Sequence, residues 1–546
     1  MRLAISNSQT SDRHAAQATG CNSHVGSPSR ALQLLSVRAA ATAGDGPNPG
    51  QAPVPKMAAA DAEILASPLV LPCGVSVPNR IAKGAMTESL ADARTNKPNQ
   101  LHCRLYSRWA DGGLGLSITG NVPVDRNHRE AARNVCCEPF IDSESDFKLY
   151  AAAVKGKEGK CIAIVQLTHA GRQTTPAVNK NYLLSASDVR VVIPKYPSWI
   201  FGKPRPMTID EIQDVKERFA YAAAVMERAG FDGVELHAAH GYLISQFLSP
   251  LSNFRTDSYG GSAENRRRLL LETVRAIRAR TNAGFAVGVK LNSADFQRGG
   301  LTEEESLDIV RALRAEGVDF IEVSGGTYES HAMMDGVGAL TERRESTRRR
   351  EAYFLDFAHA ARRAVPGLPI ILTGGFRSRA AMAAAIRDGA CDLVGLGRPL
   401  CLDPELPRRL TSPATGDVRA AIGWVDGWAG LEAAATFWYA RQLWRLAAGG
   451  EPRLGQGVLY SLTIQVRRSH ASLSLPASHT NCLAPPRRHG AQHSTITDLT
   501  AAAAQSVRHI FLEPAITAPL SWLWDLLWPV RRPGRPSLTA GEGKAK

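Results

Sequence analysis

The sequence predicts a (β/α)8 barrel, the TIM-barrel fold, with an extension at each end. Three observations support this. Eight short apolar runs recur between residues 80 and 396, helical stretches with capping signals separate them, and polar residues or glycines follow the runs. A doubly wound sheet is the alternative, but it offers no reason for eight units and normally shows a glycine-rich turn after its first strand.

The eight apolar runs are the expected strands. Continuous apolar runs are typical of parallel strands covered on both faces; short buried helices give the same pattern, but the length of the runs and their flanking glycines favour strands. In order, they are Arg80 to Met86, Leu114 to Thr119, Cys161 to Leu167, Gly233 to His237, Phe285 to Leu291, Phe320 to Val323, Pro369 to Leu372, and Asp392 to Leu396.

Two of the intervening helices carry clear start and stop signals. Capping boxes at Thr208-Ile-Asp-Glu211 and Thr302-Glu-Glu-Glu305 begin amphipathic runs. Gly230 and Gly317 follow these runs, where a left-handed residue is expected to end the helix.

Candidate catalytic residues follow the fourth expected strand. His237, His240 and Tyr242 come at its end, where the loops of a barrel build the active site. Two ring N–H groups can stabilise negative charge on one oxygen, and a phenol can supply a proton. The alternative is a strand end with two structural histidines.

Glycines follow the last three expected strands, at Ser324-Gly-Gly326, Thr373-Gly-Gly375 and Gly397-Arg398. Each alone is more typical of a tight turn. Together they lie where barrels commonly bind phosphate, because backbone N–H groups there can approach an anion closely.

At this point the sequence resembles the old yellow enzymes, or NADH:flavin oxidoreductases, which bind FMN in a (β/α)8 barrel. The resemblance covers roughly residues 65 to 410. It is carried by Pro78-Asn-Arg-Ile, Gln166-Leu-Thr-His-Ala-Gly-Arg172, the run from Gly230 through Gln246-Phe-Leu-Ser-Pro250, and Arg255-Thr-Asp-Ser-Tyr-Gly-Gly-Ser-Ala-Glu-Asn-Arg266.

The resemblance implies an FMN site. Ala85, Met86 and Thr87 would flank the isoalloxazine, with the Thr87 hydroxyl near O4 and N5; Gly120 would leave room at the ring, and Gln166 would bind its pyrimidine edge. Lys290 would face N1 and O2, where many members carry Arg; Lys keeps the charge but loses the bidentate geometry, and a lysine solvated at the strand mouth is the alternative. The phosphate would be held by Gly375, Gly397 and Arg398.

The resemblance also implies an activity. FMN would take hydride from NADH or NADPH and pass it to the activated C=C bond of an enone-type small molecule in a ping-pong scheme. His237 and His240 would clamp the carbonyl oxygen, and Tyr242 would protonate the α-carbon. Other members carry Asn where this chain has His240. A flavin-binding barrel acting as a sensor or scaffold, or another FMN barrel reductase, is the alternative.

The cysteine spacing and the charge distribution argue against some classes of cofactor and partner. None of the nine cysteines forms the closely spaced run of an iron–sulfur cluster, and we expect reduced thiols and no metal. The net charge of +14 lies mostly outside the barrel, and no nucleic-acid-binding fold accompanies the basic patch at Arg343-Arg344 and Arg348 to Arg350. We therefore expect no nucleic-acid partner, and the oligomeric state stays open.

The expected domains are residues 1–56, an extension; residues 57–412, the FMN-binding barrel; residues 413–457, a helical extension rich in Trp and Ala; and residues 458–546, a low-complexity, disordered tail. The first segment resembles a transit peptide, or it precedes a true start at Met57. We expect an intracellular protein, in a plastid or mitochondrion in the first case and cytoplasmic in the second. The apolar stretch Leu520 to Val530 is too short for stable membrane insertion.

Overall fold

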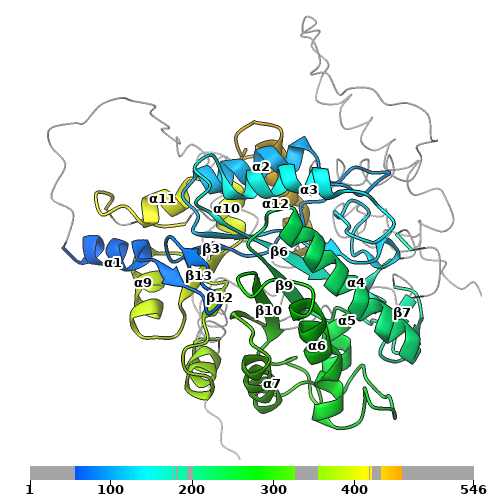
Figure 1. Cartoon of the computed structure of the whole chain (residues 1–546). Helices are drawn as coiled ribbons and strands as arrows, with labels where there is room; N and C mark the ends of the chain where they lie inside the picture. The colour runs from blue at the N-terminus through cyan, green and yellow to red at the C-terminus, as the bar shows by residue number, and fades with distance from the viewer. Residues whose placement is uncertain are drawn as a thin grey trace, which may run out of the picture. The chain divides into compact units, whose positions relative to one another are not determined.

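The computed structural model describes residues 56–175, 178–179, 183–193, 201–325, 354–416, 418–420, 432–457 and 461. Within these ranges eight parallel strands close into a barrel, because the pairing of β4 with β6 joins the two ends of the sheet order β4-β3-β13-β12-β11-β10-β9-β6 (Figure 1). The strands are β3 (Ile81–Lys83), β4 (Leu116–Ile118), β6 (Ile162–Thr168), β9 (Gly233–Ala238), β10 (Ala286–Asn292), β11 (Phe320–Ser324), β12 (Ile370–Thr373) and β13 (Leu393–Leu396). Each overlaps one of the eight predicted strands, and the (β/α)8 fold is confirmed.

Helices alternate with the strands along the chain. They are α1 (Lys56–Ala66), α2 (Gln100–Asp111), α3 (Glu144–Lys155), α4 (Ile209–Arg228), α5 (Leu243–Leu248), α6 (Ala263–Arg278), α7 (Glu303–Ala315), α9 (Arg379–Arg387), α10 (Arg398–Leu402), α11 (Leu406–Leu410) and α12 (Glu432–Ala447). Both predicted capping boxes are present, at the starts of α4 and α7. Gly230 and Gly317 have φ of +91° and +73°, the left-handed conformation expected after a helix.

Five short strands lie outside the barrel staves. β1 (Leu69–Val70) and β2 (Ser76–Val77) form an antiparallel pair, β5 (Val122–Pro123) pairs in parallel with the end of β6, and β7 (Leu183–Ser185) pairs in parallel with β8 (Pro204–Pro206). Leu71 and Val77 pack with Ala82 and Leu116 in a core cluster separate from the main one. The first hairpin therefore closes the barrel at the end where the strands begin.

Side chains alternate along each strand between this inner cluster and the larger core under the helices. In β11, Phe320 belongs to the inner cluster, whereas Ile321 and Val323 belong to the outer core. Gly288 on β10 makes room for Phe320, since a Cβ there would lie 2.1 Å from the phenyl ring. Glu322 lies between the two outward residues, so it points into the barrel.

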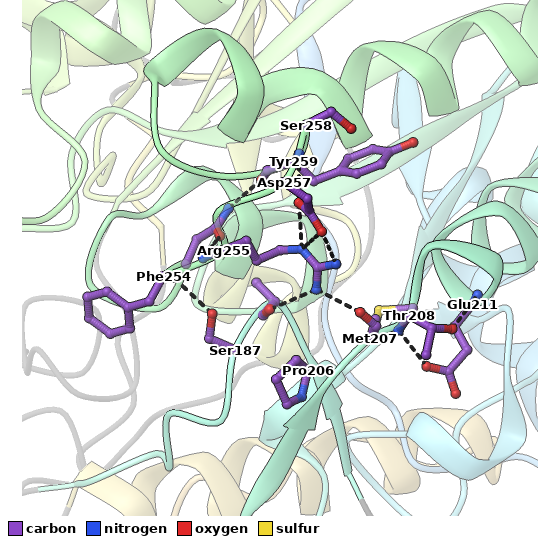
Figure 2. A network of polar contacts seen from close by, with 12 residues as sticks. Ser187, Pro206, Met207, Thr208, Glu211, Phe254, Arg255, Asp257, Ser258 and Tyr259 are labelled. Carbon is purple, nitrogen blue, oxygen red and sulfur yellow. Dashed lines mark hydrogen bonds and ion pairs between the residues drawn. The ribbon is translucent and has the colours of Figure 1, made fainter.

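In the stretch from Arg255 to Arg266, the first residues hold loops together. The Arg255 guanidinium contacts Asp257 at 2.5 Å and donates to the carbonyl oxygens of Ala186 (3.1 Å) and Met207 (2.7 Å) (Figure 2). The hydrogen bond from Arg255 lowers the pKa of Asp257. This network joins the loop before α6 to the residues that directly follow β7 and β8.

The predicted C-terminal helix is present as α12, which packs on α2 and α10. No helix in the described ranges is both long and apolar enough to cross a membrane. The Leu520 to Val530 stretch, the arginine patch and residues 1–55 lie outside the described residues, as do nearly all of the predicted tail and Gly326.

Candidate active site

A layer of polar side chains lies inside the barrel, toward the ends of its strands. The register of the strands brings these side chains to the same level. Gln166, Glu235, Lys290 and Glu322 are the inward residues of four adjacent strands, β6, β9, β10 and β11. Gln166 Nε2 donates to Glu235 Oε1 at 2.6 Å, and Lys290 Nζ contacts Glu322 Oε1 at 2.9 Å. Lys290 is 5% exposed, so the alternative of a solvated lysine is wrong.

Charge in this layer is nearly balanced. Burial, and then the neighbouring Glu322 carboxylate, raise the pKa of Glu235 well above its usual value. Burial opposes ionisation of Glu322, but Lys290 outweighs it and lowers the pKa of Glu322. These two pKa shifts favour a neutral Glu235 and an ion pair between Lys290 and Glu322.

Above this layer the two histidines and the tyrosine come together. His237 Nε2 and His240 Nδ1 lie 3.3 Å apart, and the ring centroids of His237 and Tyr242 are 4.5 Å apart. His240 Nε2 lies 2.6 Å from the Ser324 hydroxyl on β11. His240 has φ of +59°, an uncommon conformation that turns the chain at the end of β9 and brings its ring back to His237.

Both imidazoles are neutral near physiological pH. Burial lowers the pKa of His240 to about 3, with Lys290 adding to the effect, and burial likewise lowers the pKa of His237. A neutral imidazole carries one N–H. The two facing nitrogens are within hydrogen-bond distance of each other, and when each carries its proton there, both can donate to one ligand oxygen that lies beside the pair.

These residues line one cavity of about 210 Å³. Eight predicted site residues contribute to it, and one further residue, Asn121, joins them; the eight are Ala85, Met86, Thr87, Gln166, His237, His240, Tyr242 and Lys290. In two of the lining residues, one buried polar atom makes no hydrogen bond within the described part of the chain: Asn121 Oδ1 and His237 Nδ1. Buried polar atoms usually have partners, so these two fit a cavity that receives a polar ring system.

Gln166 presents a defined edge to the cavity. Its Nε2 is directed to Glu235, which leaves Oε1 as the group that can accept from a ligand N–H. Lys290 supplies a cation beside it. An acceptor and a cation side by side fit the pyrimidine edge of a flavin, which carries an N–H between carbonyl oxygens.

The remaining predicted residues lie outside the cavity lining. Gly120 N donates to Glu88 Oε1 at 3.0 Å, and a Cβ at Gly120 would lie 2.4 Å from the Met86 carbonyl oxygen. Gly120 therefore allows close packing against Met86. Its predicted contact with the isoalloxazine ring stays a prediction.

The predicted phosphate glycines fit an anion. Gly375 has φ of +80°, and a Cβ at Gly397 would meet only Met86, at 3.7 Å, so backbone approach is open there. Arg398 is exposed, and its guanidinium carbon lies 6.0 Å from the centre of the Tyr439 ring of α12. Pairing of β12 with β13 brings the two glycine turns to one side of the barrel.

Sequence reasoning missed three carboxylates. Glu235 and Glu322 lie within strands that were interpreted as apolar, although their spacing of two residues from His237 and Ser324 was a signal for the inward face. Glu130 lies on the loop between β5 and β6 and gives no periodic signal. Its carboxylate accepts hydrogen bonds from Thr87 and Tyr242.

A second histidine cluster lies beside this loop. Ligand atoms of Asp125, His128 and His169 lie within 4.8 Å of one another, which is close enough for a metal ion. However, His128 Nε2 accepts from Leu184 N (3.3 Å), and His169 Nδ1 accepts from Gly171 N (3.1 Å). Each opposite nitrogen therefore carries the proton, whereas a metal-binding histidine donates through its outer nitrogen. The hydrogen-bond directions favour a structural cluster.

Comparison with known proteins decides the family. The sequence profile of the NADH:flavin oxidoreductase / NADH oxidase family matches residues 67–415. The chain belongs to this family. The predicted relationship to the old yellow enzymes is thereby confirmed.

Relatives of this oxidoreductase include two fungal proteins called NADH-dependent flavin oxidoreductase iliE. The one from Neonectria sp. is 38% identical over 437 residues, which is 75% of this chain and 55% of that protein. The one from Hypocrea jecorina is 38% identical over 362 residues, which is 64% of this chain and 89% of that protein. Morphinone reductase in complex with tetrahydroNAD superposes with a TM-score of 0.51 at 25% identity, over 67% of this chain and 95% of that one.

Old yellow enzymes are FMN-dependent and use NAD(P)H. The cavity residues described above fit this cofactor at its pyrimidine edge, and the glycine turns fit its phosphate.

Proposed function

We propose that this oxidoreductase reduces the activated C=C bond of α,β-unsaturated carbonyl compounds, with NADH or NADPH and the enone using the same cavity in turn. The observation that carries the proposal is the pair of neutral imidazole nitrogens 3.3 Å apart, in one cavity with a phenol. When bound, FMN supplies the redox chemistry, accepting hydride from the nicotinamide and donating it to the alkene.

In this proposal His237 Nε2 and His240 Nδ1 donate to the carbonyl oxygen of the substrate. The two donors withdraw electron density from the alkene and stabilise the negative charge that the oxygen gains as hydride arrives at the β-carbon. Neutral rings suit this role, because they polarise the oxygen without first protonating it.

Tyr242 supplies the proton. Its ring packs edge-on against His237 with an interplanar angle of 87°, and this contact supports a phenol that lies next to the proposed carbonyl clamp. A proton from Tyr242 to the α-carbon completes the reduction.

The cofactor would be held by the chain's own polar groups. Gln166 Oε1 and Lys290 would bind the pyrimidine edge, Ala85 to Thr87 and Gly120 would flank the ring, and the phosphate would be held by Gly375, Gly397 and Arg398. Arg398 offers the fork of donors that a phosphate accepts.

A flavin-binding sensor or scaffold is the competing function, and flavin half-reactions separate the two. Purified protein is reduced anaerobically with NADH or NADPH, and cyclohexenone is then added. We expect the flavin to bleach and then regain its colour as cyclohexanone forms, with FMN identified by mass spectrometry of the heat-released ligand. Reoxidation only by oxygen would contradict ene-reduction and favour the competing function.

A further inference from the structure

Glu130 brings a carboxylate up to residues that line the cavity of the candidate active site. Its two oxygens accept hydrogen bonds from four side chains: Thr87 and Asn134 donate to Oε1, and Asn121 and Tyr242 donate to Oε2. Three of these donors line the cavity. In the described ranges no Lys, Arg or His forms an ion pair with Glu130, so its hydrogen-bond partners there are neutral.

The loop that carries Glu130 is firmly held. Two residues before Glu130, the His128 ring stacks on His169 with centroids 4.3 Å apart, and its Nδ1 lies 2.9 Å from Asp125. Leu184 N donates to the other nitrogen of the His128 ring. The structural histidine cluster therefore fixes the approach of Glu130 to Tyr242.

The residues of this group differ in their exposure to solvent. Tyr242 is 4% exposed and Asn121 is 7% exposed, whereas Glu130 is only partly buried. A phenol that gives its proton to a substrate in a closed cavity needs that proton replaced from water. In the described part of the chain, Glu130 is a titratable residue that accepts a hydrogen bond from the phenol and is itself partly exposed.

We propose that Glu130 is the positioning residue of Tyr242 and the carrier that returns its proton. Before transfer, the hydrogen bond to the carboxylate holds the phenol oxygen in position, and the O–H then turns to the α-carbon. The Tyr242 O–H bond then breaks as the enolate electron pair forms the new α-carbon–hydrogen bond, and tyrosinate remains. A proton from water adds to the Glu130 carboxylate and passes to the tyrosinate, so each turnover consumes one solvent proton and leaves both side chains unchanged.

This inference rests on the proposed ene-reduction, so its test has one readout that needs no turnover. Tyrosinate formation is titrated by near-ultraviolet difference spectra in FMN-bound wild type, Glu130→Gln and Tyr242→Phe; the last variant identifies the Tyr242 signal. A neighbouring carboxylate opposes formation of tyrosinate, so we expect Tyr242 to ionise at lower pH in Glu130→Gln. An unchanged titration would overturn the coupling, even if cyclohexenone proves not to be a substrate.

The second readout is the half-reaction with cyclohexenone. Glu130→Gln keeps a similar side-chain shape but cannot carry a proton, and we expect it to slow flavin reoxidation about 10²-fold while reduction by NADH stays at the wild-type rate. Formate should restore the rate of Glu130→Ala in a concentration-dependent way, but not that of Glu130→Gln, in which the site is filled.

Glu138→Gln is the matched control. Glu138 lies on the same connection between β5 and β6, and its carboxylate binds Arg126, whereas that of Glu130 binds Tyr242. It should show wild-type rates in both half-reactions. Equal slowing of reduction and reoxidation in Glu130→Gln, or failure of formate to rescue Glu130→Ala, would show that Glu130 has only a structural role.

Discussion

Individual side chains at the mouth of the barrel differ in whether a strand or a loop positions them. Gln166, Lys290 and Glu322 follow the strand alternation and lie in one polar layer. Tyr242 and Glu130 lie beyond strand ends, and their contact depends on the loops that carry them. The chemistry proposed for the site uses both kinds, because strands hold the cofactor edge and loops bring the proton donor.

Tyr242 should act in one half-reaction only. Hydride transfer from NADPH to the flavin needs no proton from Tyr242, whereas reduction of an enone does. Tyr242→Phe should therefore leave anaerobic flavin reduction near the wild-type rate and slow reoxidation by cyclohexenone about 10² to 10⁴-fold. Stopped-flow absorbance measures both steps, and equal slowing of the two would identify Tyr242 as a packing residue.

Ser324 should control which nitrogen of His240 carries its proton. When the Ser324 hydroxyl donates to Nε2 across 2.6 Å, the proton of the ring lies on Nδ1, facing His237. We expect Ser324→Ala to weaken binding of a phenol to the oxidised enzyme about tenfold, corresponding to one hydrogen bond of about 1.4 kcal/mol. The affinity for the phenol is measured by titrating the charge-transfer band that it forms with the oxidised flavin.

Ser293→Ala is the control for this change. The Ser293 hydroxyl lies in the loop after the neighbouring strand, is buried, and makes no hydrogen bond in the described ranges. Similar loss of phenol affinity in both variants would show that the effect comes from general packing at the strand ends.

At the scale of elements, α2 contains a pH-sensitive contact. His102 is 1% exposed, and its Nδ1 accepts from Asn99 N in the capping box of the helix. Burial lowers its pKa from 6.5 to about 3. The unfolded chain thus binds a proton below about pH 6.5 that the folded chain does not, so folding stability is present above this pH and is lost as the pH falls toward 3.

The expected loss from His102 is about 2 kcal/mol between about pH 7 and about pH 5, from the lowered pKa. His102→Gln can still accept at the cap, and it should lose that much less stability over this range than wild type. Urea unfolding of the FMN-bound protein at both pH values measures the difference. If His102→Gln keeps the wild-type pH dependence, burial of His102 is not the cause.

Sequence patterns predicted the strands and helix starts better than the polar side chains inside the barrel. Apolar runs and capping boxes placed eight strands and the α4 and α7 starts, because each depends on residues close together in the chain. Glu235 and Glu322 were hidden within short runs that were interpreted as continuous. Glu130 was missed because its role arises from contact with Tyr242, 112 residues away, which no local pattern encodes.

For the whole molecule, the C-terminal extension is joined to the barrel through Glu88. Trp444 of α12 is 5% exposed, and its indole N–H donates to the Glu88 carbonyl oxygen at 2.8 Å. The carboxylate of Glu88 in turn accepts from Gly120 N, under the cavity. The extension therefore supports the chain segment that forms one wall of the candidate active site.

Removing the Trp444 side chain tests this support. Trp444→Ala should lower the free energy of unfolding by about 3 to 5 kcal/mol, the usual cost of deleting a buried aromatic ring, and speed the release of FMN, because the Glu88 segment loses its packing. Trp444→Phe keeps most of the packing and should lose only about 1 kcal/mol with the hydrogen bond. Urea unfolding and flavin fluorescence on dilution measure the two effects. Leu454→Ala, at a residue 52% exposed just beyond α12, should change neither. Wild-type stability and FMN retention in Trp444→Ala would mean that α12 packs on a barrel that does not depend on it.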